Sequence, residues 1–224
     1  MEAKIAAAYT GKRRASQSAR HRRVYVTGKQ VVAGIYPEGM TGQVLYAQLC
    51  RSVGVHRARH RLMAGDGAEW IPVMAHQWFP DFSYQLDHFH LKSRLRQVAQ
   101  DPHLAGRWIA WALGGEHQRI ARSLAQLVAR GVVDAKTARE TLSYLRINRE
   151  AMWAHQDLLA AGAPPELCTR GSGVIEHTID LTVARRMKRQ GMRWSREGAH
   201  NLLALRSMLM DPPSWWAWWK EVAA

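Results

Sequence analysis

The stretch Arg61-Leu62-Met63-Ala64-Gly65-Asp66-Gly67 decides the fold that we expect for this chain. Its first part, Arg61–Ala64, is a short apolar run of the kind that forms a strand in a sheet. The run stops at an aspartate between two glycines, which let the backbone turn. We therefore expect the carboxylate of Asp66 at the C-terminal end of a strand, where ligands of α/β sheets bind. An aspartate between glycines is also a common turn residue, so Asp66 alone does not specify a site.

The segments around this strand alternate between strand and helix patterns. Two short apolar segments before it predict a hairpin, Ala3–Tyr9 and Val24–Ile35, whose second arm is broken near Gly28. Helical spacing follows over Thr41–Val53. After the strand come a helix, a strand and a helix, over Ala68–Trp78, Phe82–Leu86 and Asp87–Gln100. The order β, β, α, β, α, β, α predicts an α/β fold with a central mixed sheet flanked by helices.

The pattern changes near residue 101 and changes back near residue 166. Asp101–Ala161 holds only helix patterns, so we interpret 101–166 as an all-α insertion between 1–100, the first part of the core, and 167–210, where the chain returns to it. In the returning part, helices are expected over Val174–Arg189 and from a Ser195 cap to Met210. Residues 211–224 form a tryptophan-rich tail.

The composition points to a polyanionic partner. Lysine and arginine number 32 against 18 aspartates and glutamates, a formal net charge of +14 over 224 residues. This excess fits DNA, RNA or a membrane surface, and charge alone does not choose among them. No stretch approaches the roughly 20 apolar residues of a membrane span, and no signal-peptide layout is visible. With only Cys50 and Cys168, no disulfide framework is indicated. We expect a cytoplasmic protein that does not enter the membrane.

Two carboxylates far apart in the sequence are the candidates for chemistry. Asp66 is expected at a strand end, and Glu176 near the start of a helix entered through Gly171-Ser172-Gly173. Hydrolysis of a phosphodiester with two divalent ions needs hard oxygen ligands that converge from separate elements. Taken alone, a glutamate at such a position is more commonly a first-turn residue that interacts favourably with the helix dipole.

Three motifs in order resemble bacterial insertion-sequence transposases. They are Gly65-Asp66-Gly67-Ala68-Glu69-Trp70-Ile71 with Phe79-Pro80, then Leu86-Asp87-His88-Phe89-His90-Leu91, then Gly171-Ser172-Gly173-Val174-Ile175-Glu176 continuing through Arg185, Lys188 and Gly191-Met192-Arg193-Trp194-Ser195. The resemblance is to the Kra and Lre families, and the third motif resembles the Kra type in particular. These families belong with the Mutator-like DDE transposases, and the resemblance covers nearly the whole chain.

The resemblance implies a ribonuclease-H-like core that binds Mg²⁺ or Mn²⁺ and acts on DNA, at transposon ends and target, in association with the bacterial nucleoid. Asp66 would be the second acid of the triad and Glu176 the third, with a helical insertion between them. Asp87 and His90 match the family's Asp-x-x-His motif, in which His90 would position a phosphate or an acidic ligand. A polar pair that closes a strand is an equal alternative for these two residues.

The family's first aspartate lies on the first strand of the core, upstream of a segment that Glu2–Ile5 and Tyr9 resemble. The chain starts in this segment, and Ala3–Tyr9 contains no aspartate. We therefore expect the first strand and the first acid to be missing, which puts catalysis in question. Asp180, one helical turn beyond Glu176, is a weaker candidate to replace it.

Basic and aromatic residues extend the DNA-binding hypothesis. The side chains expected to contact DNA fall in two groups, Lys12, Arg13, Arg14, Arg20, Arg22 and Arg23 in the loop of the hairpin, and Arg185, Arg186, Lys188, Arg189 and Arg193 after the third acid. Solvated surfaces are the alternative for both groups. Trp215, Trp216, Trp218 and Trp219 are too dense for all four to be buried, and indicate either a partner or oligomer contact or an eroded C-terminus.

Three functions remain in competition. The first is a transposase that cleaves phosphodiester bonds at element ends and transfers the freed strand. The second is a catalytically inactive, DNA-binding transposase remnant. The third is a basic RNA-binding module, for which no convergence of carboxylates is expected.

Overall fold

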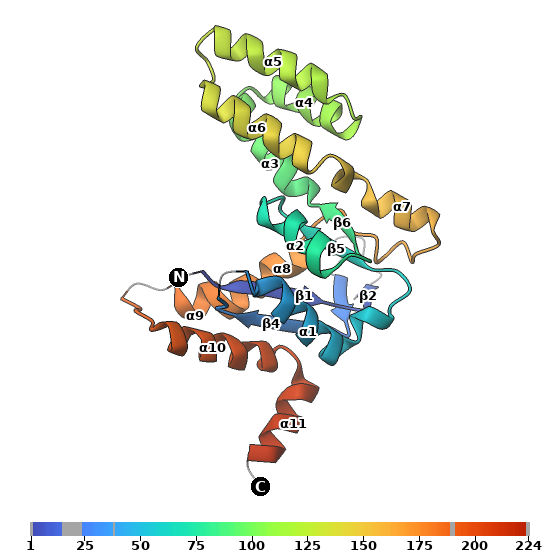
Figure 1. The fold of residues 1–224 in the computed structure, drawn as a ribbon, viewed down its shortest axis with the longest axis vertical. Helices are drawn as coiled ribbons and strands as arrows, with labels where there is room; N and C mark the ends of the chain where they lie inside the picture. Colours follow the sequence, from blue (N-terminus) through green and yellow to red (C-terminus); the bar gives the residue numbers. More distant parts are fainter. Residues whose placement is uncertain (1, 15–23, 38, 189–190, 223–224) are drawn as a thin grey trace. The chain divides into compact units, whose positions relative to one another are not determined.

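The computed structural model describes the strands and helices of residues 2–14, 24–37, 39–188 and 191–222. Figure 1 traces them in chain order. The chain divides into two compact units. Unit 1 joins Met1–Arg59 with Gly173–Ala224, and unit 2 is His60–Ser172. Each unit is described by itself below.

Unit 1 begins with the predicted hairpin. Strand β1 (Lys4–Ala8) pairs antiparallel with β4 (Gln30–Gly34), and β2 (Gly11–Arg14) pairs antiparallel with β3 (Val24–Thr27). The break that we expected near Gly28 is present, since β3 ends at Thr27 and β4 starts at Gln30.

One detail of the hairpin prediction is wrong. Lys12, Arg13 and Arg14 were expected in the connecting loop, but they lie in β2, where they pair with Val26, Tyr25 and Val24. The ladder joins backbone groups, so a strand can extend through a basic run that has no apolar pattern. Arg20, Arg22 and Arg23 lie outside the described residues.

Helices cover the β1–β4 sheet of unit 1. The helix α1 (Thr41–Val53) packs on β1 and β4, α8 (Gly173–Ile179) on β1, and α10 (Arg196–Leu209) on β4. Adjacent residues of a strand point to opposite faces, and Val31 and Val32 are both buried, so both faces of β4 are covered. Ala33 and Ile35 share one cluster with Val183, Ala199 and Leu203.

The predicted helix Val174–Arg189 is present but interrupted. It consists of α8, a π-helical turn over Asp180–Ala184, and the short α9 (Arg185–Met187). The Ser195 cap is confirmed, because its side chain accepts a hydrogen bond from the Gly198 N–H at the start of α10. The tryptophan-rich tail forms α11 (Pro212–Val222).

Unit 2 is built on a β-α-β segment. Strand β5 (Leu62–Gly65) leads to α2 (Trp70–Trp78) and then to β6 (Ser83–Leu86), which pairs parallel with β5. The helix α3 (His88–Ala99) follows directly. Because the two strands are parallel, their C-terminal ends lie at the same edge, and the residues that follow Gly65 and Leu86 are neighbours there.

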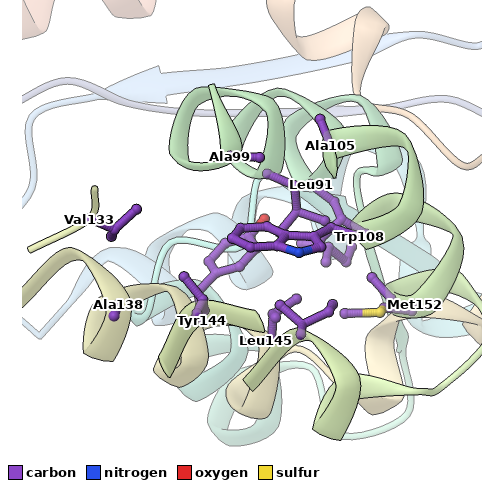
Figure 2. Close-up of a cluster of buried hydrophobic side chains, with 14 of the residues drawn as sticks. Leu91, Ala99, Ala105, Trp108, Val133, Ala138, Tyr144, Leu145 and Met152 are labelled. Carbon is purple, nitrogen blue, oxygen red and sulfur yellow. The ribbon is translucent and has the colours of Figure 1, made fainter. Parts of the chain in front are cut away.

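The rest of unit 2 is helical. The helices α4 (Pro102–Leu113), α5 (His117–Ala129), α6 (Ala135–Ile147) and α7 (Ala154–Ala160) follow one another, and Asp101 and Asp134 cap α4 and α6. Figure 2 shows their core, in which Trp108 is fully buried among Leu91, Leu145 and Met152. The indole N–H of Trp108 donates to Ser123 Oγ at 3.0 Å, which satisfies the polar atom of this side chain.

The predicted α/β class is therefore confirmed at its coarse level, as a mainly helical chain with small sheets. The described strands form three separate pairs. The domain boundaries expected near residues 100, 166 and 210 stay predictions, and the two compact units divide elsewhere, at residues 59 and 172. Over the described residues, every helix is too short or too polar to span a membrane.

Candidate active site

Asp66 stands where β5 ends, as the sequence predicts. It follows Gly65, which pairs with Leu86 of β6, and its side chain is exposed. One carboxylate oxygen, Oδ1, accepts the N–H of Ala68 at 3.0 Å. Within the described residues Oδ2 has no hydrogen-bond partner. Asp66 therefore presents an oxygen ligand to solvent at the C-terminal edge of a parallel strand pair, the usual location of α/β ligand sites.

The backbone at Asp66 is held by the insertion helix α6. The Tyr144 hydroxyl donates to the Asp66 carbonyl oxygen at 2.9 Å, and the Asn148 amide donates to the Gly67 carbonyl oxygen at 3.3 Å. Gly67 has φ 86°, and a Cβ placed there would lie 2.6 Å from Tyr144 Cε2 and 2.7 Å from Leu86 Cδ1. Helix α6 thus packs against the turn so closely that only glycine fits.

Tyr84 and Tyr144 lie beside the Asp66-Gly67 turn, and both are protonated. Burial raises the pKa of Tyr84, and the nearby negative charge of Asp66 raises it further. Burial also raises the pKa of Tyr144, although the Arg94 guanidinium, 4.6 Å from the centre of its ring, acts in the opposite direction. A protonated Tyr144 is required for its hydrogen bond to the Asp66 carbonyl, so the support of Asp66 persists through neutral pH.

Asp87, at the end of β6, has a different environment. It is 1% exposed and caps α3, with Oδ1 accepting the Phe89 N–H at 2.6 Å. Its Oδ2 accepts both the N–H of Ser172, at 2.7 Å, and the Ser172 hydroxyl. Its own N–H donates to the Gly65 carbonyl oxygen at 2.7 Å, which extends the strand ladder. Asp87 therefore ties the end of β6 to the Gly171-Ser172 segment.

His90 lies near Asp87, at the third position of α3. A carboxylate oxygen of Asp87 and a ring nitrogen of His90 are within 4.8 Å of each other. His90 is half-buried, whereas Asp87 is buried. The Asp-x-x-His spacing therefore brings the two side chains together through ordinary cap geometry, in which the N-cap and N3 residues face each other.

A buried polar network behind the strand end was not expected from the sequence. Gln85 is fully buried, and its Oε1 accepts the N–H and the Nδ1–H of His155, both at 2.9 Å. The ring of His88 contacts the Met152 carbonyl oxygen at 2.8 Å through Nε2. Burial lowers the pKa of both histidines. Only the alternation in β6, which points Gln85 inward, could have signalled this network.

Glu176 belongs to unit 1, in the first turn of α8, and is exposed. Two side-chain hydrogen bonds stabilise α8 and the π-helical turn after it: the hydroxyl of Thr178 donates to the Val174 carbonyl oxygen, and that of Thr182 to the Thr178 carbonyl oxygen. Asp180 is paired with Arg185, whose Nε donates to Asp180 Oδ2 at 2.8 Å. This ion pair engages one carboxylate oxygen of Asp180, which makes Asp180 less suited than Asp66 to bind a metal ion.

Four of the five basic residues that were expected to contact DNA after Glu176 lie within the described residues. Arg185, Arg186, Lys188 and Arg193 are exposed in unit 1, and Arg189 lies outside the described residues. In the hairpin, the Lys12 ammonium lies 5.4 Å from the centre of the Tyr9 ring. These positions leave the four exposed side chains accessible to an anionic partner.

Asp66 and Asp87 differ in their suitability for a divalent cation. Mg²⁺ and Mn²⁺ take hard oxygen ligands with accessible lone pairs. Asp66 fits, because its carboxylate is exposed and its Oδ2 accepts no described hydrogen bond. Asp87 fits poorly, because it is buried and both of its oxygens already accept hydrogen bonds.

A comparison with known protein families places most of this chain in one of them. The family model described as "Uncharacterised protein family (UPF0236)" matches residues 48–220, a range that includes Asp66, Asp87, His90 and Glu176. No curated protein and no solved structure matches the chain. Because the match covers more than half of the sequence, the chain belongs to the family UPF0236.

Proposed function

We propose that this chain is the catalytic chain of a DDE-type DNA transposase, with Asp66 and Glu176 as carboxylate ligands of divalent cations. The observation that carries the proposal is the setting of Asp66, an exposed carboxylate at the C-terminal edge of a parallel strand pair. The three ordered motifs supply the reaction class, and the net charge of +14 supports a DNA substrate.

The strand pairs are compatible with the ribonuclease-H-like core that the resemblance implies. Such a core contains a mixed sheet, and the chain has antiparallel pairs in unit 1 and a parallel pair, β5–β6, in unit 2. The helices α4 to α7 fall between Asp66 and Glu176, as the helical insertion of a Mutator-like DDE transposase would. We propose this fold on that basis.

Each residue of the proposed metal site has a separate role. When bound, Mg²⁺ or Mn²⁺ would activate the attacking oxygen and stabilise the leaving one. The N–H of Ala68 donates to Oδ1 of Asp66 and so orients the carboxylate before a cation binds. Oδ2 would then be the oxygen that binds the cation. Tyr144 and Asn148 fix the peptide behind it. Asp87 positions the start of α3, and through it His90, whose imidazole is suited to a phosphate oxygen.

The test is a strand-cleavage assay in Mg²⁺ with labelled DNA that carries the ends of the element. Two proteins are assayed, the chain as it is and the chain lengthened at its N-terminus by any residues that the gene encodes upstream. The second is included because Ala3–Tyr9 holds no aspartate. In the active form, Asp66→Asn and Glu176→Gln are each expected to lower cleavage by at least about a hundredfold, as is common for groups that stabilise charge in a transition state.

Each variant has a matched control. Asp157→Asn removes an exposed carboxylate of unit 2, and Glu197→Gln removes another first-turn glutamate of unit 1. Both controls are expected to cleave like the parent chain. Equal loss in a variant and its control would contradict the assignment of that carboxylate.

The alternative is a catalytically inactive, DNA-binding remnant, favoured by the absence of an aspartate from Ala3–Tyr9. This alternative predicts DNA binding without cleavage by either the chain or its extended form. It also predicts no saturable Mn²⁺ binding that depends on Asp66, which electron paramagnetic resonance can measure without any substrate.

A further inference from the structure

A hollow in the helical part of unit 2 has a strongly basic lining. It measures about 270 Å³ and is lined by Gly115, Glu116, His117, Gln118, Arg119, Arg122 and Arg149. These residues come from the α4–α5 turn, the first turns of α5, and the segment just after α6. The volume is several times the roughly 30 Å³ that one water molecule occupies in the liquid, so a group larger than water can enter.

Three guanidinium groups surround the hollow and one carboxylate opposes them. Arg119 donates to Glu116 at 2.8 Å, and its guanidinium lies 4.5 Å from the centre of the Trp111 ring. Arg122 and Arg149 are exposed, and neither forms an ion pair with another described residue. After the Glu116 pair is subtracted, two positive charges remain at the rim.

Glu116 is the one acidic residue among those that line the hollow. The His117 ring contacts the Ala112 carbonyl oxygen at 3.2 Å. Burial lowers the pKa of His117, and the nearby charge of Arg149 lowers it further, so the ring is neutral at pH 7. Helix α5 also starts here with an N-cap, Glu116, whose side chain makes no cap hydrogen bond in the described structure, and the N-terminal end of a helix favours an anion.

We propose that this hollow binds one phosphate group of a DNA backbone. Arginine suits this role, since its planar guanidinium donates in pairs to phosphate oxygens. The inference rests on the proposed function, from which it takes DNA as the partner. It deepens that function by assigning the helical insertion a contact with the substrate. The three guanidinium groups carry the inference, and the helix end adds to it.

The test measures binding of the full chain to a fluorescently labelled duplex by anisotropy, in EDTA, over a range of salt concentrations. The pocket variant is Arg122→Gln with Arg149→Gln. The control variant is Arg130→Gln with Arg139→Gln, which removes the same charge from exposed positions of the same unit. Arg130 follows the last residue of α5, about 20 Å from its start at 1.5 Å per residue.

The pocket variant is expected to bind about tenfold more weakly than the control at 0.1 M salt. Its slope of log K against log salt is expected to fall by about 0.9, the value for one lost phosphate contact. Equal affinity and equal slope for the two variants would overturn the proposal, since general charge would then explain the binding.

A second arm separates DNA phosphate from free phosphate. Inorganic phosphate and adenosine monophosphate are added at millimolar concentration and matched ionic strength, and the thermal midpoint is recorded. Stabilisation that disappears in the pocket variant, combined with unchanged DNA affinity, would overturn the DNA assignment in favour of a small phosphate compound. Because binding is measured without a metal ion, loss of cleavage in Asp66→Asn with intact pocket-dependent binding separates this inference from the catalytic proposal.

Discussion

Replacing Gly67 with alanine tests the claim that helix α6 holds the turn behind Asp66. Gly67 has φ 86°, and a new Cβ would lie 2.6 Å from Tyr144 Cε2, 2.7 Å from Leu86 Cδ1 and 2.8 Å from the Tyr144 hydroxyl oxygen. Real Cβ atoms do not approach other atoms this closely, so the ring or the turn must move.

Gly131 provides a matched control in the same unit. It has φ 69°, and a Cβ added there would meet nothing within 4 Å. A left-handed conformation costs an alanine about 1–2 kcal/mol, and the stiffer unfolded chain offsets about 0.4–1 kcal/mol. We therefore expect Gly131→Ala to lower the free energy of unfolding by about 1 kcal/mol.

Gly67→Ala carries the same backbone cost and an overpacking cost of about 1–3 kcal/mol. The expected total is about 2–4 kcal/mol. With a urea dependence of about 1–3 kcal/mol per molar, the unfolding midpoints of the two variants should differ by roughly 1 M.

The assay is equilibrium urea unfolding followed by circular dichroism and by tryptophan fluorescence, since Trp108 is fully buried in unit 2. A double-mutant cycle with Tyr144→Ala should reduce the cost of Gly67→Ala, because the ring that the new Cβ meets is gone. Equal midpoints for the two glycine variants, or an unchanged cost without the Tyr144 ring, would refute the close packing of α6 on the turn.

The remaining predictions concern the buried polar groups of unit 2. Asp87→Ala should lower the free energy of unfolding by about 3 kcal/mol, because it leaves the buried N–H and hydroxyl of Ser172 without their acceptor. The control Asp101→Ala removes an exposed helix cap and should lower the free energy of unfolding by about 1 kcal/mol. Similar urea midpoints for the two would contradict this. The pKa values of His88 and His155 are lowered from 6.5, so the unfolded chain binds more protons below that pH. Stability should therefore be constant above about pH 6.5 and fall as the pH decreases towards the folded pKa values. Urea midpoints between pH 8 and 5 measure this fall, which should be smaller in His155→Gln and unchanged in His103→Gln, an exposed control.

Local chemistry in the sequence was sufficient to predict most elements. The apolar run before Gly65-Asp66-Gly67, the helical spacing of Thr41–Val53 and the Ser195 cap each depend on neighbours within a few residues. Such signals act over one strand or one helical turn, so they do not require knowledge of the rest of the chain. The exposed position of Asp66 at a strand end belongs to the same class of prediction.

The π-helical turn at Asp180–Ala184 and the strand at Gly11–Arg14 are different, because each departs from its local pattern. A strand with three basic residues forms when a partner strand supplies the ladder, and Val24–Thr27 is that partner. The sequence shows the residues of both segments but not that they pair.

The sequence by itself determined the coarse α/β class, most of the individual elements and the exposed acid at the end of β5. Tertiary structure decided which polar residues are available for chemistry. Asp66 and Asp87 both follow a strand, yet Asp66 is exposed while Asp87 is 1% exposed and accepts hydrogen bonds from Phe89 and Ser172. Ser172 is 85 residues away from Asp87. Contacts over such separations depend on how helices and strands pack, which no local pattern encodes.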